Sequence, residues 1–294
     1  MELPTSESHK SIKDYINNSP PGWETLFESC SAELIQISDI IDGIIKDKGP
    51  IVFPLIEEMF NAFYKTPLDK VSVIICGQDC YHSFNNTTNK PTATGSSFGT
   101  RKGEKVPPSL QNIFKEIKRS YPDEFTIPTS GDLTNWEIQG VFLLNSCLSV
   151  EMGKPLSHCG KFTLWDGFIS KVLKAVEQKN PNCIYVLLGK EILKMKKYIN
   201  ENSIVYEVSH PSPYSVKISF EGSGIFKKIN KALKKQGKQP IDWNLINKSE
   251  EDIKKEEKDI KKSAEKYFGK ELTEKELTEK ELVKIIEDEK DGEV

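Results

Sequence analysis

Two short polar strings in this 294-residue chain contain side chains suited to acid-base and hydrogen-bonding chemistry. They are Gly77-Gln78-Asp79-Cys80-Tyr81-His82 and Ser209-His210-Pro211-Ser212-Pro213, and each directly follows an apolar run. Asn145 follows a third apolar run. If these runs are neighbouring strands, an acid, an amide, an aromatic ring and two histidines converge from distant parts of the chain.

Four apolar runs must position these groups, and all four consist mainly of β-branched and aliphatic residues. They cover residues 71–76, 141–144, 184–188 and 204–208. Such runs are typical of strands buried on both faces of a parallel sheet. Apolar residues with helical spacing lie between and after them, at 110–117, 168–176 and 225–233. We therefore expect an α/β fold, a three-layer sandwich with a central four-stranded, mainly parallel sheet flanked by helices.

The place of the site follows from this architecture. In an open parallel sheet, ligands bind beyond the carboxyl ends of the strands, which is where the two polar strings and Asn145 would meet. Residues 83–106, rich in Asn, Thr, Gly and Ser, would form a long loop over the same end. Loops of that length in compact domains are usually functional.

The composition predicts a reduced, soluble chain that folds around its own core. Hydrophobic residues make up 37% of the sequence. We find no signal peptide and no apolar run of about 18 residues, so we expect an intracellular protein, with nucleus, cytoplasm and viral replication compartment not distinguished. The six cysteines form no CxxC pair, and no second Cys/His pair lies near Cys76, Cys80 and His82. We expect no disulfide and no metal.

The net charge of -3 hides an asymmetry along the chain. Residues 1–246 carry 29 Lys+Arg against 27 Asp+Glu, and residues 247–294 carry 12 against 17. A body of charge +2 neither supports nor excludes DNA binding, so any DNA contact must come from local placement of charge and backbone amides. Nearly all basic residues are lysines, which indicates an AT-rich genome, as in large DNA viruses and some microbes.

The charged segment 247–294 contains a repeated Lys-Glu-Leu-Thr-Glu unit. Five residues turn a helix by about 500°, so successive leucines step by about 140° and form no stripe. A solvated or partly helical appendage is favoured over a coiled coil built on Ile253, Ile260 and Tyr267, which lie seven residues apart. The acidic excess leaves a protein partner for this segment open.

Further motifs, in order along the chain, resemble those of one enzyme family. They are Gly95-Ser96-Ser97-Phe98, Pro107-Pro108-Ser109-Leu110, Gly131-Asp132-Leu133, Gln139-Gly140-Val141-Phe142-Leu143-Leu144-Asn145 and Gln239-Pro240-Ile241-Asp242-Trp243. With the two polar strings, they make roughly residues 50–245 similar to the family 1 uracil-DNA glycosylases. The resemblance implies a monofunctional, cofactor-free hydrolase that flips uracil out of single- or double-stranded DNA and hydrolyses its N-glycosidic bond. It would leave an abasic site for base excision repair.

We expect a monomer with three parts: a polar N-terminal segment at 1–20, a catalytic domain at 21–246 and the appendage at 247–294. Within that domain, Asp79 corresponds to the carboxylate that orients the attacking water and favours the cationic sugar. His210 would donate a hydrogen bond to uracil O2 as a neutral imidazole.

Other residues would read the base and hold the DNA. Asn145 corresponds to the carboxamide that accepts from uracil N3–H and donates to O4. Phe98 would stack on the ring, Tyr81 would exclude the methyl group of thymine, and Gln78 completes the uracil-binding set. The residues implied in DNA contact are His82, Pro107, Pro108, Ser109, Ser212, Tyr214 and Ser215.

Three positions depart from the family pattern. Cys80 stands where proline is usual, so the loop loses a fixed φ and gains a thiol. Tyr214 stands where most members carry a leucine that wedges into the vacated base stack. The usual Gly-Ser phosphate contact after Gly189 is missing, and the lysines of 194–197 would supply charge instead.

Two other functions remain as alternatives. The first is a non-catalytic DNA-binding replication adaptor that retains the fold, against which the intact Asp79, Asn145 and His210 argue. The second is a glycosylase for a different base, which Tyr81 and Asn145 together disfavour. Release of uracil, rather than binding alone, would separate these functions.

Overall fold

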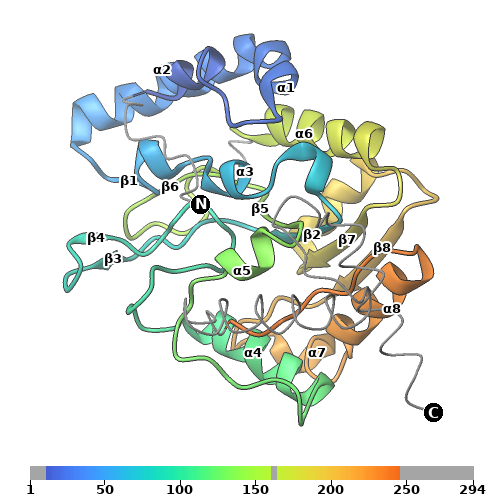
Figure 1. Cartoon of the computed structure of the whole chain (residues 1–294). Helices are drawn as coiled ribbons and strands as arrows, with labels where there is room; N and C mark the ends of the chain where they lie inside the picture. The colour runs from blue at the N-terminus through green and yellow to red at the C-terminus, as the bar shows by residue number, and fades with distance from the viewer. Residues whose placement is uncertain (1–10, 160–163, 246–294) are drawn as a thin grey trace, which may run out of the picture. The chain divides into compact units, whose positions relative to one another are not determined.

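A four-stranded parallel sheet runs through the computed structural model, which describes residues 11–159 and 164–245 (Figure 1). Across the sheet the strands are β5 (Val141–Asn145), β2 (Val73–Gly77), β7 (Ile184–Leu188) and β8 (Ile204–Val208). Every pairing in it is parallel. The four expected strands are confirmed, with β2 beginning two residues later and ending one residue later than its apolar run.

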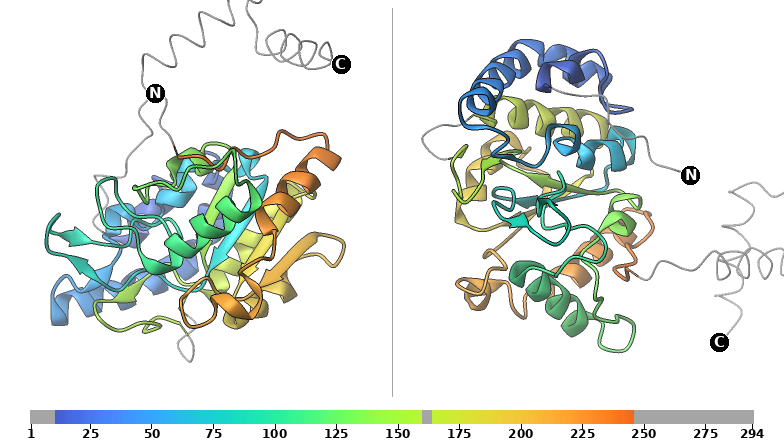
Figure 2. Two further views of the ribbon diagram at one scale, coloured as in Figure 1. Left: turned by 90° about the horizontal axis from the view of Figure 1, so that it is seen from below. Right: turned by 90° about the vertical axis from the view of Figure 1, so that its left-hand side faces the viewer.

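Successive residues of each central strand enter opposite cores, as the two-residue repeat of a strand requires. Ile74 and Cys76 belong to one core, whereas Val73 and Ile75 belong to the other. Helices cover both faces, which confirms the three-layer sandwich (Figures 1 and 2). Those over the first core are α1 (Glu24–Ser29), α2 (Ser31–Lys48), α3 (Asn61–Lys65) and α6 (Asp166–Lys179). Those on the second core side are α4 (Pro108–Ser120), α5 (Thr134–Glu137), α7 (Val216–Ser219) and α8 (Ile225–Lys235).

Short elements connect these layers. The 3-10 helices are η1 (Ile12–Ile16), η2 (Ile56–Glu58), η3 (Leu68–Lys70) and η4 (Lys190–Tyr198). The short strands are β1 (Val52–Phe53), β6 (Val150–Glu151), β3 (Phe84–Asn85) and β4 (Lys90–Pro91), which pair antiparallel as β1 with β6 and β3 with β4. The segment 83–106 is therefore not wholly a loop, since a hairpin forms where the Asn85 side chain accepts from the amides of Thr87 and Thr88.

Part of the N-terminal segment takes part in the fold. Ile12 and Tyr15 of η1 are fully buried, and the Ser11 hydroxyl donates to Asp42 of α2 at 2.6 Å. The expected appendage at 247–294 lies outside the described residues. Among the residues described, no helix combines the length and apolar character that crossing a membrane would require.

Candidate active site

The carboxyl ends of β2 and β5 lie side by side, because Gly77 pairs with Asn145 at the last register of the two strands. The segments that follow them, together with the turn after β8, enclose a cavity of about 340 Å³. Its lining residues are Gln78, Asp79, Cys80, Tyr81, His82, Ala93, Gly95, Ser96, Phe98, Ser109, Asn145, Pro155, His210 and Ser212. Nine of the predicted site residues thus meet in one place. Those outside the lining are Pro107, Pro108, Tyr214 and Ser215.

Asp79 is held in the cavity wall by a backbone group from a distant segment. The amide N–H of Leu156 donates to its Oδ2 at 2.8 Å. Burial raises the pKa of the Asp79 carboxyl, while the Leu156 hydrogen bond and the nearby His82 oppose that shift. Within the described part of the chain no lysine or arginine pairs with this carboxylate, so its negative charge is left for a positive centre in a ligand.

His210 is fixed as a neutral hydrogen-bond donor. The backbone N–H of Ser212 donates to His210 Nδ1 at 3.1 Å. A ring nitrogen that accepts carries no proton, so Nε2 carries it. Burial lowers the pKa of His210, which favours this neutral form. No described residue offers Nε2 an acceptor, and the donor remains available at the cavity.

Asn145 is oriented by the thiol that replaces the expected proline. Its Nδ2 donates to Cys80 Sγ at 3.5 Å, and Cys80 Sγ in turn donates to the carbonyl of Cys147 at 3.5 Å. Burial raises the pKa of Cys80, so this group is a neutral thiol. A Cβ on Gly77 would collide with Asn145 Oδ1. Glycine at this position therefore keeps space for the carboxamide.

Phe98 is placed by strained backbone held from two sides. Its φ of 62° lies in the left-handed region, which a bulky side chain rarely adopts. Tyr81 Oη donates to the Phe98 carbonyl at 3.0 Å, and the amide of Ser97 donates to the carbonyl of Leu143 at 2.9 Å. The Phe98 and His210 rings lie 5.7 Å apart between centroids. Such strain at a cavity wall is typical of a binding site.

The turn after β8 is tied together by serine hydroxyls. Ser215 Oγ donates to the His210 carbonyl at 2.8 Å and lies 3.0 Å from Ser212 Oγ. Asn112 Nδ2, on α4, donates to the carbonyl of Pro211 at 2.8 Å. The start of α4, with Ser109 in the cavity lining, is thereby joined to the His210 turn.

Several contributing residues were missed by the sequence analysis. Leu156 acts through its backbone N–H, which any residue except proline possesses, so its identity gave no signal. Asn112 acts by donating to the backbone carbonyl of Pro211, in the turn that carries His210. Pro155 and Ser96 line the cavity because of where the chain passes, although Ser96 lay within a motif used for the family resemblance.

The segment after Gly189 forms η4, and two of its lysines are engaged in ion pairs. Lys194 Nζ lies 3.6 Å from Asp166 and Lys196 Nζ lies 2.7 Å from Glu207. Their suggested role as substitutes for a phosphate contact stays a prediction. Among the described residues, no group of three or more His, Cys, Asp or Glu side chains could hold a metal, and all six cysteines are free thiols.

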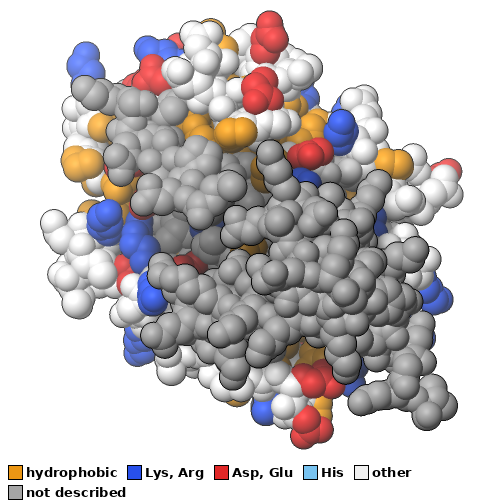
Figure 3. All heavy atoms as spheres, in the orientation of Figure 1, with side chains coloured by type: hydrophobic (Ala, Val, Ile, Leu, Met, Phe, Trp, Pro, Cys, Tyr) orange, Lys and Arg blue, Asp and Glu red, His pale blue; other side chains and the backbone are white. Residues whose placement is uncertain are grey.

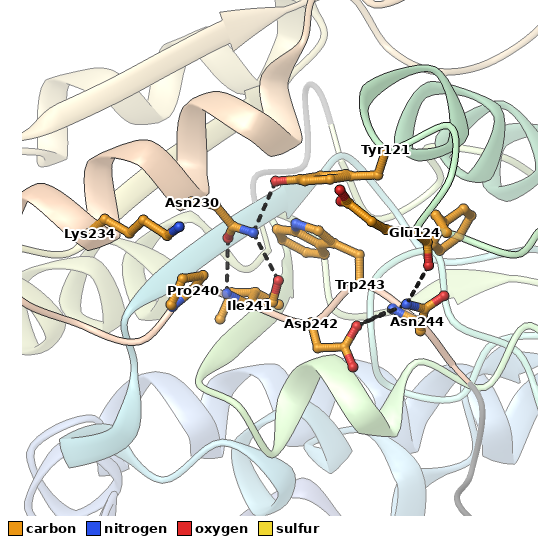
Figure 4. A pocket seen from close by; sticks show the side chains of 10 residues that line it. Tyr121, Glu124, Asn230, Lys234, Pro240, Ile241, Asp242, Trp243 and Asn244 are labelled. Atoms are coloured by element: carbon orange, nitrogen blue, oxygen red, sulfur yellow. Dashed lines mark hydrogen bonds between the residues drawn. The ribbon is translucent and has the colours of Figure 1, made fainter. Parts of the chain in front are cut away.

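A second cavity, of about 260 Å³, lies where the segment 240–244 packs against α8 and the end of α4 (Figure 4). Asn230 donates to Tyr121 Oη at 3.0 Å and to the carbonyl of Ile241 at 2.9 Å. Its Oδ1 accepts from the amide of Ile241 at 2.9 Å. This carboxamide joins elements of the fold, and neither of its amide hydrogens is left for a ligand.

Charged side chains of both signs lie on the surface (Figure 3). Basic and acidic side chains are both exposed on the face shown in Figure 3. This mixture agrees with the small net charge of the body and leaves recognition to local groups.

The sequence matches the model of the uracil DNA glycosylase superfamily over residues 63–234. A curated relative named uracil-DNA glycosylase, from Francisella tularensis subsp. novicida (strain U112), is 42% identical over 199 residues, which cover 67% of this chain and 86% of the relative. A relative of the same name from Proteus mirabilis (strain HI4320) is 40% identical over 201 residues, covering 68% and 85%. The matched span of the family model contains every predicted site residue.

Solved structures give the same picture of the fold. The crystal structure of mimivirus uracil-DNA glycosylase superposes with a TM-score of 0.72 at 24% identity, covering 83% of this chain and 97% of that chain. A variant of mimivirus UNG, solved in complex with UGI, superposes with a TM-score of 0.71 at 26% identity, covering 77% and 89%.

Proposed function

The chain belongs to the uracil-DNA glycosylase superfamily and is a hydrolase that cleaves the N-glycosidic bond of uracil in DNA; from this premise we propose that Asp79, His210 and Asn145 are the residues that cleave the bond and read the base. The observation that supports this most is the neutral His210, whose Nδ1 already accepts from Ser212. A proton-bearing Nε2 in the same cavity as a carboxylate and a carboxamide is what base release requires.

In this mechanism the bond between C1′ and N1 breaks with its electron pair moving to the uracil. The negative charge that develops on O2 is stabilised by the Nε2–H of His210. The positive charge on the sugar is stabilised by the Asp79 carboxylate, which also orients a water molecule. That water adds to C1′ and passes a proton to the Asp79 carboxylate, which completes the abasic sugar, and the uracil anion takes up a proton from solvent as it leaves.

Other groups that line the same cavity select the base. Asn145 Oδ1 accepts from uracil N3–H, and the N–H of Nδ2 that Cys80 leaves free donates to O4. Cytosine presents the reverse pattern and is rejected. Phe98 stacks on the ring, Tyr81 blocks a methyl group at C5, and Gln78 completes the pocket.

The DNA strand is held around the cavity mouth by the remaining predicted residues. Hydroxyl and backbone groups of Ser109, Ser212 and Ser215 contact phosphates, with His82 and the Pro107-Pro108 turn beside them. Tyr214, which is 98% exposed, enters the space left by the flipped nucleotide. These neutral contacts suit a body of low net charge.

We also propose that residues 21–246, against which η1 packs, form the catalytic domain of a monomer and that 247–294 is an appendage able to bind a protein partner. A chain ended after residue 246 should then release uracil at the rate of the full chain. A substantial loss of activity would place part of the appendage in the catalytic unit instead.

The defining experiment measures base release from a uracil-containing single-stranded oligonucleotide in chelator, beside a thymine control. We expect free uracil, an uncut strand with an abasic site, and no thymine. Tyr81→Ala should release thymine as well, because the methyl group then fits. Binding without base release would instead favour the replication adaptor, and no thymine release by an active Tyr81→Ala variant would contradict the role of Tyr81.

A further inference from the structure

Three of the six cysteines lie around the acid of the proposed active site. Cys80 directly follows Asp79 in the sequence, and its thiol is near enough to Cys159 for the two groups to influence each other. The thiol of Cys147 interacts directly with that of Cys159. Neither Cys147 nor Cys159 belongs to the motifs that carry the family resemblance, and the proposed reaction uses neither.

Hydrogen bonds hold Cys147 beside the segment that carries Asp79. The Cys147 amide donates to the carbonyl of Gln78 at 3.0 Å, and the Cys147 carbonyl accepts from Cys80 Sγ at 3.5 Å. These two partners are the residues on either side of Asp79. Cys147 is also buried in the first core, so packing fixes its position as well.

Cys159 is joined to the same carboxylate through a different segment. Its amide donates to the carbonyl of Leu156 at 3.0 Å, and the amide of Leu156 donates to Asp79 Oδ2 at 2.8 Å. The φ of Leu156 is 64°, in the left-handed region that a bulky side chain rarely adopts. Such a conformation persists only while its surroundings hold it. A displacement of Cys159 therefore reaches the amide that orients Asp79.

We propose that Cys147 and Cys159 are a modification site for small-molecule disulfides such as oxidised glutathione, and that the bond they then form with each other slows uracil release reversibly. This inference rests on the proposed function of Asp79. Bonded sulfurs lie about 2.05 Å apart, closer than two thiols in contact, so the bond draws the turn of Leu156 towards Cys147. A misplacement of about 1 Å at an active site can lower a rate about a hundredfold.

The exposure of the two thiols sets the order of the steps. Five of the six cysteines are buried and Cys159 is partly exposed, so Cys159 meets a reagent in solution first. The neighbouring Cys159 thiol and burial both raise the pKa of Cys147, so Cys147 reacts second.

Each step is a thiol–disulfide exchange. The deprotonated sulfur of Cys159 attacks one sulfur of the reagent, whose S–S bond breaks, and one glutathione thiolate leaves. Cys147 then loses its proton, its sulfur attacks the Cys159 sulfur of the mixed disulfide, and the second glutathione thiolate leaves. The protein gives up two electrons, the reagent is reduced to two thiols, and those thiols take up the two protons that the cysteines released.

The test treats the reduced full-length chain with oxidised glutathione. Single-turnover uracil release is measured before treatment, after it, and after reduction with dithiothreitol. We expect treatment to slow release by about tenfold or more, because the amide that orients Asp79 is displaced, and we expect reduction to restore the starting rate. Peptide mapping of the treated chain should find Cys147 joined to Cys159.

Two variants separate this disulfide from other oxidation. Reduced Cys159→Ser should release uracil within about twofold of the wild-type rate and should lose the response to oxidised glutathione, because only buried cysteines remain. Cys30→Ala is the matched control, because Cys30 is buried between α1 and α2. Its response to oxidised glutathione should equal that of the wild type.

Three outcomes would overturn the inference. They are an unchanged rate in a chain whose Cys147–Cys159 bond is found by mapping, an equal loss of rate in treated Cys159→Ser, and a treated wild-type chain that carries glutathione on Cys159 without the internal bond. A reduced wild-type chain that releases no uracil would refute the proposed function instead, and peptide mapping would still report whether the bond forms.

Discussion

The two cavities contain similar groups and use them in opposite ways. Each has aromatic rings, a carboxamide and an acid in its lining. In the second cavity the amide of Asn230 donates to Tyr121 Oη and to the carbonyl of Ile241, and its oxygen accepts from the amide of Ile241. In the first, Asn145 gives one hydrogen to a sulfur, and among the described residues its Oδ1 has no donor and His210 Nε2 has no acceptor.

This difference shows that unused hydrogen-bonding capacity marks a site better than residue type does. A buried polar group normally finds a partner within the fold, as Asn230 does. Groups left open in a cavity lower the stability of the folded chain unless water or a ligand satisfies them. The Gly77 backbone and the Cys80 thiol keep Asn145 in that open arrangement.

We expect the largest effect on turnover from neutralising the acid of the first cavity, compared with an acid of the second. Asp79→Asn should lower turnover by about a thousandfold, because an amide neither carries the negative charge that favours the cationic sugar nor accepts a proton from water. Binding of uracil-containing DNA should survive, since the side-chain shape is kept. Single-turnover release of uracil and a direct binding assay measure the two properties.

Asp242→Asn is the matched control, because Asp242 lies in the second cavity and accepts from Asn244. Its turnover should equal that of the wild type. Comparable losses in the two variants would break the distinction between the cavities, as would an Asp79→Asn enzyme of full activity.

Substituting alanine for the carboxamide of each cavity in turn compares their effects on activity and on stability. Asn145→Ala should lower uracil release by about a hundredfold while leaving the fold intact, because its partners in the protein are few. Asn230→Ala should lower the free energy of unfolding by about 2 kcal/mol, because it leaves the backbone N–H and carbonyl of Ile241 without their hydrogen-bond partner. Chemical denaturation and single-turnover kinetics on both variants measure the two effects.

Folded Asn230→Ala should keep its activity. A large stability loss in Asn145→Ala would mean that this side chain holds the fold. Loss of activity in fully folded Asn230→Ala would likewise show that the second cavity contributes to the reaction.

The strands and the meeting of the site residues could be predicted from sequence because each rests on a repeated local pattern. The run 184–188 is continuously apolar, and β7 coincides with it, since burial on both faces demands such a run. A parallel sheet then forces the following polar residues to one edge. Asp79, Asn145 and His210 therefore met as expected, whatever the details of their loops.

What escaped prediction depends on individual contacts that the type of a residue does not indicate. The hold of Leu156 on Asp79 joins positions 77 residues apart through an amide that carries no sequence signal. Cys80 was expected to cost the loop a fixed φ and to add a thiol, and its contact with Asn145 was not foreseen. The β3–β4 hairpin arises from local turn contacts within a segment whose composition indicated a loop.

The smallest expected effect concerns the stability cost of keeping Asp79 ready to react. Burial raises the pKa of Asp79 in the folded protein, so the folded chain binds that proton more tightly than the unfolded chain. The stabilising contribution is present at low pH and is lost as pH rises through the folded pKa. Asp79→Asn, which keeps an acceptor for the Leu156 amide, should thus raise the free energy of unfolding at neutral pH by about 1 kcal/mol or less.

That gain should shrink as pH falls, because the wild-type carboxyl then becomes protonated and neutral like the amide. Denaturant titrations of both proteins at neutral and mildly acidic pH measure the difference. A variant less stable than wild type at neutral pH would show that the Leu156 contact outweighs the desolvation of the carboxylate. The cavity that contains Asp79 would then not lower the stability of the fold, and the proposed contrast with the cavity of Asn230 would fail.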